Sequence, residues 1–128
     1  MAILTSKGVE TETWIANASL SGKRGYGVKH HSTDGECVIA TAASVNIGVI
    51  YDLGAKDGAA ATDISVATQG VVPAVAGAAI AVGKHVTTDS DGKFVEASSG
   101  ENCTGYSDEA AAADGDFFQL RIAPHIAP

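Results

Sequence analysis

The sequence has few of the large side chains from which most protein cores are built. Aromatic residues make up only 5% of its 128 residues, and much of the 45% hydrophobic fraction is alanine. A chain of this length forms one domain with a modest core and needs neither disulfides nor metals to fold. Because alanine removes little apolar surface from water, we expect the folded chain to be weakly stable alone and to associate with other subunits.

Cysteine is also scarce, with only Cys37 and Cys103 present. Two cysteines exclude a disulfide-stapled scaffold and favour a reducing compartment. We expect both side chains to be small buried hydrophobic groups. Their positions in the sequence leave open whether they lie on neighbouring strands.

Basic residues are outnumbered, with 8 lysines and arginines against 15 aspartates and glutamates and a formal net charge of -7. No basic run could replace the counterions of a phosphate backbone, so nucleic-acid binding is not expected. The sequence has neither an unbroken apolar stretch of roughly 18 residues nor the basic and apolar regions of a signal peptide. The expected protein is soluble, made in the cytoplasm and not bound to a membrane.

The residue patterns of catalytic and metal sites are missing as well. Adjacent His30 and His31 would point to opposite faces of a strand and so would not share one metal ion, and His85 and His125 add no ligand spacing. The segment 89–93, Asp-Ser-Asp-Gly-Lys, opens like a calcium loop but has no closing glutamate, which favours a turn. The sequence therefore predicts no enzyme, no catalytic residue, no metal site and no cofactor.

Turn signals at short intervals indicate an all-β fold. Ser-Gly and Asp-Gly pairs separate short runs of β-branched or aromatic residues. The expected strands are 26–30, 36–41, 47–52, 63–68, 70–75, 85–88, 94–97, 104–107 and 117–122. The alanine-rich stretches 75–82 and 109–113 allow at most short helical turns. We therefore expect a small barrel or sandwich of short antiparallel strands.

The chain also repeats itself at a spacing of 57 residues. Sliding the sequence by this amount gives eight identities in a 25-residue window, including both Asp-Gly turns and one glycine of a strand. The superposed pairs are Asp34-Gly35 on Asp91-Gly92, Gly48 on Gly105, and Asp57-Gly58 on Asp114-Gly115. The repeat predicts a core with pseudo-twofold symmetry.

The first residues differ in character from the rest of the chain. Residues 1–19 are polar with little apolar periodicity, so we expect an N-terminal arm followed by a β domain over 20–128. Such an arm would be disordered or extended in the free protein and would become ordered on a partner. Trp14, the only tryptophan, lies with Ile15 at the end of the arm. Trp14 is interpreted either as a core residue or as an anchor in a partner.

A glycine-rich loop comes after the arm and carries a basic pair. Gly22–Gly27 reads Gly-Lys-Arg-Gly-Tyr-Gly and lacks the strand-to-helix setting of a phosphate-binding loop. Lys23 and Arg24 could meet an acidic surface or remain solvated. Together with Tyr26, Trp14 and Ile15 they are the candidate interface residues.

The order of motifs in the second half is more specific than any one of them. It runs Ala-Ile-Ala-Val-Gly-Lys-His-Val at 79–86, Asp-Gly-Lys-Phe-Val at 91–95, Gly-Tyr at 105–106, Ala-Ala-Ala-Ala-Asp-Gly-Asp at 110–116 and Gln-Leu-Arg-Ile at 119–122. This order resembles the capsid cement, or head decoration, proteins of tailed phages. The resemblance covers residues 47–123 best, whereas the longer start departs from the family's usual opening.

The resemblance implies a structural virion protein on the exterior of the capsid. Copies of such proteins commonly form trimers near local threefold axes, bridge neighbouring subunits of the major capsid protein and stabilise the head. The expected partners are therefore the major capsid protein and further copies of this chain. Two alternatives remain open: another virion component such as a tail or fibre adaptor, and a small carbohydrate-binding module that uses Trp14, Tyr26, Tyr51 or Tyr106 as a stacking platform.

Overall fold

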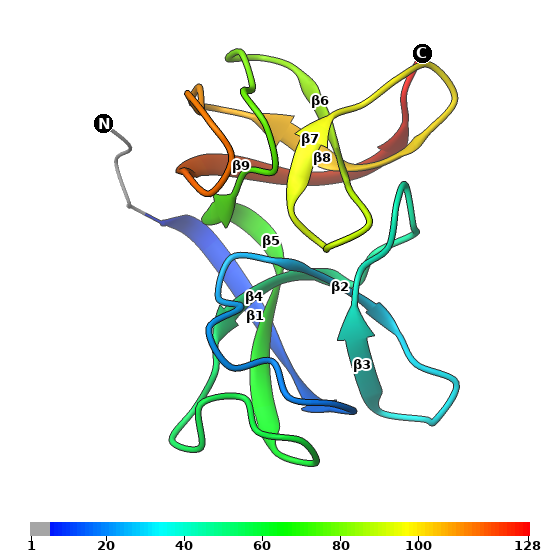
Figure 1. The fold of residues 1–128 in the computed structure, drawn as a ribbon, viewed down its shortest axis with the longest axis vertical. Helices are drawn as coiled ribbons and strands as arrows, with labels where there is room; N and C mark the ends of the chain where they lie inside the picture. Colours follow the sequence, from blue (N-terminus) through cyan, green and yellow to red (C-terminus); the bar gives the residue numbers. More distant parts are fainter. Residues whose placement is uncertain (1–5) are drawn as a thin grey trace.

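The computed structural model describes residues 6–128 and shows a chain of strands and turns (Figure 1). Over this range it contains no helix, and hence no helix long and apolar enough to cross a membrane. The strands belong to one hydrogen-bonded sheet. They are β1 (Lys7–Ala16), β2 (Gly27–His30), β3 (Glu36–Ile39), β4 (Gly48–Asp52), β5 (Asp63–Val75), β6 (His85–Thr88), β7 (Phe94–Glu96), β8 (Asn102–Ser107) and β9 (Phe117–Ile126). The all-β prediction is confirmed.

The first five strands close on themselves to form a small barrel. β1 pairs antiparallel with β5 along most of its length, from Lys7 opposite Val71 to Ile15 opposite Asp63. At its end β1 also pairs in parallel with β3, through Ile15 and Ala16. The antiparallel pairs β3–β2, β2–β4 and β4–β5 complete the ring. This barrel forms the lower half of Figure 1.

Strand β5 continues out of the first barrel and begins a second one, in the upper half of Figure 1. Its residues 71–75 pair antiparallel with β9, and the sheet continues through β8 and β6 to β7. A parallel bridge between Ala76 and Phe94 returns β7 to the end of β5, where the Gly77 N–H donates to the Phe94 carbonyl oxygen at 2.7 Å. The two barrels therefore share one 13-residue strand.

The two barrels have the same connectivity, which confirms the internal repeat. In each barrel the first strand pairs antiparallel with the fifth and contacts the third in parallel. A shift of 57 residues moves β1 onto β5, so β5 is the last strand of one repeat and the first strand of the next. The glycines of the four Asp-Gly turns all have positive φ, a region that glycine adopts without strain: Gly35, Gly58, Gly92 and Gly115.

Apart from β1, which was not predicted, the observed strands agree with the predicted ones to within a few residues, with one merger. The runs 63–68 and 70–75, predicted as two strands, form the single strand β5. Gly70, the first residue of the second run, has φ +98°, and a Cβ there would lie 2.5 Å from the carbonyl oxygen of Lys7. The β1–β5 register shifts at this point. Glycine thus produces a bulge that lets β5 continue into the second barrel, where two separate strands were expected.

The expected N-terminal arm over residues 1–19 is not a separate segment in the described part of the chain. Lys7–Ala16 is strand β1, and Ala16 is completely buried. Most side chains of β1 are exposed on both faces of the strand, which explains why the sequence showed little apolar periodicity. Residues 1–5 of the expected arm lie outside the described residues. Because β1 closes the first barrel, deleting it would open the ring.

Each barrel has an apolar core of its own. The first-barrel core consists of Ala16, Leu20, Val28, Cys37, Ile50, Ile64 and Val66. The second-barrel core consists of Val49, Ala67, Val72, Ala74, Ala76, Ile80, Val86, Phe94, Ala111, Phe118 and Leu120. Val49 and Ala67 come from strands of the first barrel, so the two cores meet at the shared strand. Cys37 and Cys103 are both buried and not bridged, as predicted for small hydrophobic groups.

Polar contacts also hold the barrels together. The Asn46 side-chain amide donates to the hydroxyl oxygens of Thr88 at 3.2 Å and Thr104 at 2.9 Å. The Thr88 hydroxyl in turn donates to the Thr41 carbonyl oxygen at 2.8 Å. Asn46 is half-buried, and Thr88 and Thr104 are buried. Because these side chains are paired across the junction, separating the barrels would leave them unsatisfied. The barrels therefore form one unit.

The glycines Gly48 and Gly105 approach a neighbouring strand at equivalent places in the two repeats. A Cβ at Gly105 would lie 1.8 Å from the Arg121 carbonyl oxygen, and one at Gly48 would lie 1.9 Å from that of Ala67. We predict that Gly105→Ala lowers the free energy of unfolding by about 3 kcal/mol or more, because the backbone must move. Urea denaturation followed by circular dichroism measures this.

The matched control for this prediction is Gly83→Ala. Gly83 has φ +78° and nothing within 4 Å of an added Cβ. The control therefore introduces only backbone strain, about 1 kcal/mol. Equal losses of stability in the two variants would contradict the close approach at Gly105.

Candidate docking surface

Trp14 and Ile15 lie near the end of β1. That end of β1 lies at the lower edge of the first barrel in Figure 1. Trp14 is half-buried and packs against the first-barrel core, while its Nε1–H donates to the Glu12 carboxylate at 3.0 Å. Its ring meets His30 edge-on, with centroids 5.2 Å apart. Ile15 is 37% exposed. The pair thus combines a side chain anchored in the core with an exposed apolar neighbour.

Two side-chain contacts, together with backbone hydrogen bonds, hold the basic loop after β1. The Lys23 Nζ lies 5.0 Å from the centroid of the Tyr26 ring, a cation–π geometry. The Arg24 Nε donates to the Tyr51 carbonyl oxygen at 3.0 Å. Arg24 is exposed, whereas Lys23 and Tyr26 are half-buried. The loop therefore presents positive charge from a defined position.

Two hollows meet at Lys23 and Ile39. One, of about 390 Å³, lies against the connection between β1 and β2. The other, of about 330 Å³, lies between Tyr26 and the β6–β7 turn of the second barrel. We call the two together the Lys23 groove, lined by Asn17, Ala18, Ser19, Leu20, Lys23, Tyr26, His31, Val38, Ile39, Ser90, Asp91 and Lys93. The groove extends from one barrel to the other.

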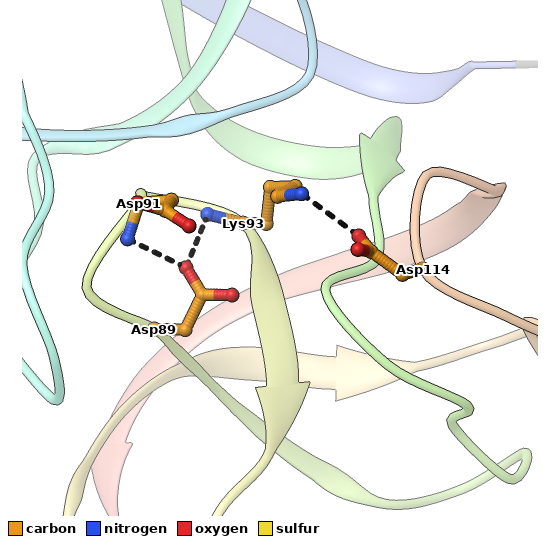
Figure 2. Close-up of polar contacts among 4 residues, drawn as sticks. All are labelled: Asp89, Asp91, Lys93 and Asp114. Atoms are coloured by element: carbon orange, nitrogen blue, oxygen red, sulfur yellow. Dashed lines mark hydrogen bonds and ion pairs between the residues drawn. The ribbon is translucent and has the colours of Figure 1, made fainter.

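The second-barrel side of the Lys23 groove is built on an aspartate-centred turn, shown in Figure 2. The Asp89 carboxylate accepts hydrogen bonds from the backbone N–H of Asp91 at 2.8 Å and of Lys93 at 3.1 Å. The Asp89 N–H donates to the Lys93 carbonyl oxygen at 2.8 Å. Aspartate oxygens that cap backbone N–H groups in this way are typical of turns. The prediction of a turn over 89–93 is confirmed.

Lys93 also reaches the connection between β8 and β9. Its Nζ lies 2.8 Å from the Asp114 carboxylate (Figure 2). The hydrogen bond to Asp114, supported by the charge of that carboxylate, raises the pKa of Lys93 above its usual value. Because the Asp114 side chain is 63% exposed, solvent screens this ion pair and little stability comes from it. Its effect is to hold a positive charge at the edge of the Lys23 groove.

Neither buried thiol has the environment of a reactive cysteine. Burial raises the pKa of the Cys37 thiol to about 11. Burial, with a further contribution from the charge of Glu101, raises the pKa of the Cys103 thiol. Thiols that keep their proton are poor nucleophiles. The two cysteines therefore do not support covalent catalysis.

The structure brings together two histidines that are 40 residues apart in the sequence. His85 of β6 faces His125 of β9, and Cys103 of β8 lies beside them. The possible metal-binding atoms of the three residues all lie within 4.8 Å of one another. Sequence reasoning missed this group because its members are on three different strands. In the β8–β9 pair Cys103 lies opposite His125. A correct prediction of this pairing register from the sequence would have indicated that these two residues are neighbours.

The aromatic side chains do not form an open stacking platform in the described part of the chain. Trp14, Tyr26, Tyr51 and Tyr106 are all half-buried. Lys23 lies over the Tyr26 ring, and the His125 ring stacks on Tyr106 at 4.6 Å. A carbohydrate-binding module stacks sugars on exposed rings, so no feature of these residues favours that alternative.

Both barrels are covered by a match to a known protein family. The family described as "Phage cement protein" matches residues 11–122. Among solved structures, the "head fiber gp8.5 N base" of bacteriophage phi29 is similar, with a TM-score of 0.69 and 21% sequence identity. The alignment covers 90% of this chain and 94% of that chain. At this identity the likeness shows the fold alone. No curated protein sequence matches the chain.

The hydrogen bonds of Asp89 predict a stability difference between two aspartates of Figure 2. We expect Asp89→Ala to lower the free energy of unfolding by about 1–2 kcal/mol, because two backbone N–H groups lose their acceptor. Asp114→Ala removes only the exposed ion pair and should leave the urea midpoint essentially unchanged. Urea denaturation of both variants tests this. A larger loss for Asp114→Ala would show that the ion pair holds the turn.

Proposed function

The chain belongs to the phage cement protein family, and from this premise we propose that it binds the outer surface of the capsid and stabilises the assembled head. Membership makes the protein a structural component of the phage virion. The observation that carries the proposal is the extent of the family match, residues 11–122, which includes strands of both barrels. The family thus corresponds to the whole two-barrel unit and not to a fragment of it.

The two-barrel unit supports a role as a preformed docking module. The barrels share β5 and are joined by the hydrogen bonds of Asn46 and Thr88. A surface that extends over both barrels, such as the Lys23 groove, therefore keeps its shape on binding. Preformed surfaces lose little conformational freedom when they bind a partner, which favours affinity.

We place the capsid contact at the Lys23 groove and at Ile15, which lies two residues before Asn17 of the groove lining. Ile15 contributes an exposed apolar side chain, and Lys23 and Arg24 contribute positive charge on a chain whose net charge is -7. An apolar centre with charged groups at its rim is a common composition of protein interfaces. The partner surface on the major capsid protein would then offer acidic groups around an apolar contact, since complementary charge favours the correct docking orientation.

Stabilisation of the head follows from linkage. A protein that binds the assembled shell but not its free subunits shifts the assembly equilibrium toward the shell. At a free concentration of about 100 times Kd, each occupied site contributes about 2.7 kcal/mol. Many sites of modest affinity can therefore strengthen a shell against internal pressure without any one interface being strong.

We further propose that the chain acts as a homotrimer near local threefold axes, so that one trimer contacts several subunits of the major capsid protein. The scarcity of large core side chains supports association between copies, because each copy alone buries little apolar surface. Linking three docking surfaces in one trimer also raises the overall affinity through effective concentration.

The likeness to the phi29 head fibre base favours a second candidate within the virion. The similarity covers 90% of this chain at a TM-score of 0.69. On this alternative the two-barrel unit is a base on the head that carries a further appendage. Electron microscopy separates the candidates: a cement protein decorates the shell as a compact knob, whereas a base is seen with additional density extending from it.

The proposed contact predicts which substitutions weaken capsid binding. Ile15→Asp and the double variant Lys23→Ser with Arg24→Ser should each reduce affinity for undecorated heads about tenfold or more. Co-sedimentation with heads, after circular dichroism has established that the variants fold, measures this. The matched control is Val82→Asp, a 63% exposed valine in the β5–β6 connection at the upper end of Figure 1. Wild-type binding by the groove variants, with loss in the control, would place the contact at the other end.

The proposed homotrimer predicts the molar mass of the protein in solution. Sedimentation equilibrium of the purified chain should give about three times the 12.8 kDa of one copy. A strict monomer over the range of concentrations that saturates the heads would overturn the trimer. That result would not bear on the proposed capsid contact, which the binding variants test separately.

A further inference from the structure

A cluster of nitrogen and sulfur donors lies in the second barrel, and none of its residues lines the Lys23 groove. His85, Cys103 and His125 come from β6, β8 and β9, which are neighbours in the sheet order β9–β8–β6. Cys103 and His125 are direct partners across the β8–β9 pair. The cluster is therefore positioned by backbone pairing and not by loops.

The orientation of His125 follows from its hydrogen bonds. Its Nδ1 lies 2.6 Å from the Ala123 carbonyl oxygen. A carbonyl oxygen only accepts, so the Nδ1–H of His125 is the donor, and in the neutral ring the Nε2 carries a lone pair. That Nε2 points at His85, whose Nδ1 lies 2.7 Å away. An imidazole that donates one ring N–H to a carbonyl and presents the other nitrogen inward is the usual arrangement of a metal-binding histidine.

A ring and a hollow complete the surroundings of the cluster. Tyr106 stacks on His125, with ring centroids 4.6 Å apart and planes 10° apart, and lies 5.0 Å from the His85 ring. Tyr106 thus limits rotation of both imidazoles. Cys103 and His125 also line a hollow of about 180 Å³, whose rim includes the exposed side chains of Val45 and Ile126. Through this hollow an ion can reach the cluster from solvent, and a water ligand has space beside it.

We propose that His85, Cys103 and His125 bind a zinc-class divalent transition-metal ion, with water at the fourth coordination position. One thiolate and two imidazoles are borderline-soft ligands, which favour Zn²⁺ and Co²⁺ over Mg²⁺ or Ca²⁺. The ligand atoms are His85 Nδ1, Cys103 Sγ and His125 Nε2. The site is distinct from the calcium-like segment 89–93. In that segment the Asp89 carboxylate already accepts hydrogen bonds from two backbone N–H groups of the turn.

Binding requires small, specified changes. With Zn–N bonds of about 2.0–2.1 Å in a tetrahedral arrangement, the two ring nitrogens must lie about 3.3 Å apart, so they separate from the 2.7 Å of the present hydrogen bond. The Nδ1 proton of His85 moves to its Nε2, and the Cys103 thiol loses its proton to solvent. Binding therefore releases one proton and forms three metal–ligand bonds. It breaks two hydrogen bonds, the one between the histidines and the one that the Cys103 thiol donates to the Glu101 carbonyl oxygen at 3.7 Å.

The ion would act as a structural clip at the end of β9. Among the residues that the structure describes, the part of β9 beyond Ile122 pairs only with β8, through Cys103 opposite His125 and Asn102 opposite Ile126. Earlier residues of β9 also pair with β5. A metal ion would add a tie from this part of β9 to β6. Because the unfolded chain does not hold the three ligands together, binding energy would add to folding stability.

Spectroscopy with Co²⁺ tests the site directly, using the full chain without a histidine tag after treatment with a chelator. Addition of Co²⁺ should produce the visible ligand-field bands of a tetrahedral ion and a sulfur-to-cobalt charge-transfer band, saturating at one ion per chain. Zn²⁺ should abolish both and raise the melting temperature. Cys103→Ala should remove the charge-transfer band, and His125→Ala should weaken binding about tenfold or more.

Matched controls distinguish this site from non-specific binding. Cys37→Ala changes the other buried thiol, and His30→Ala changes an exposed histidine of the first barrel; both should keep the full spectrum. If Cys103→Ala does not fold, His85→Ala, at a half-buried position, provides the same loss of bands. Failure of the wild-type chain to produce tetrahedral bands, or their loss in Cys37→Ala but not in Cys103→Ala, would overturn the proposal.

Discussion

The structure depends on one strand that belongs to two barrels. β5 closes the first barrel with its beginning and starts the second with its end. Its 13 residues exceed the usual length of a strand, and the bulge at Gly70 lets it change partners without leaving the sheet. Because one rigid strand is common to both rings, the barrels have a fixed relation to each other. A surface formed from both barrels, such as the Lys23 groove, is possible for this reason.

Close backbone approach compensates for the shortage of large side chains. At Gly48 and Gly105 the neighbouring carbonyl oxygen lies where a side chain would begin, so strands pack nearer than any other residue would allow. Alanine and valine can then fill narrow barrels in which Phe94 and Phe118 are the largest completely buried groups. Because its core side chains are small, each copy buries little apolar surface on folding. This agrees with a protein that is part of a larger assembly.

In the described part of the chain, the buried thiols and two aspartates of the second barrel have structural roles. Its cysteine thiols are kept protonated by burial, and its aspartates at 89 and 114 are occupied with a turn and an ion pair. Membership of the phage cement protein family accords with this arrangement. The cluster of His85, Cys103 and His125 is the exception, because its three strands bring possible metal-binding atoms within 4.8 Å of one another.

The sequence by itself determined the strands, the turns and the repeat, because alternation and the positive φ of Asp-Gly turns are local properties. It also resembled the correct family, through motifs that keep their order in the second half. Tertiary structure alone decided that residues 7–16 join the sheet, since a strand exposed on both faces has no apolar period to read. Ring closure likewise decided which distant residues come together: Lys23 and the turn at Lys93 line one hollow, and His85 contacts His125. Those contacts depend on which strands pair across the sheet, and pairing between strands far apart in the chain leaves no local pattern in the sequence.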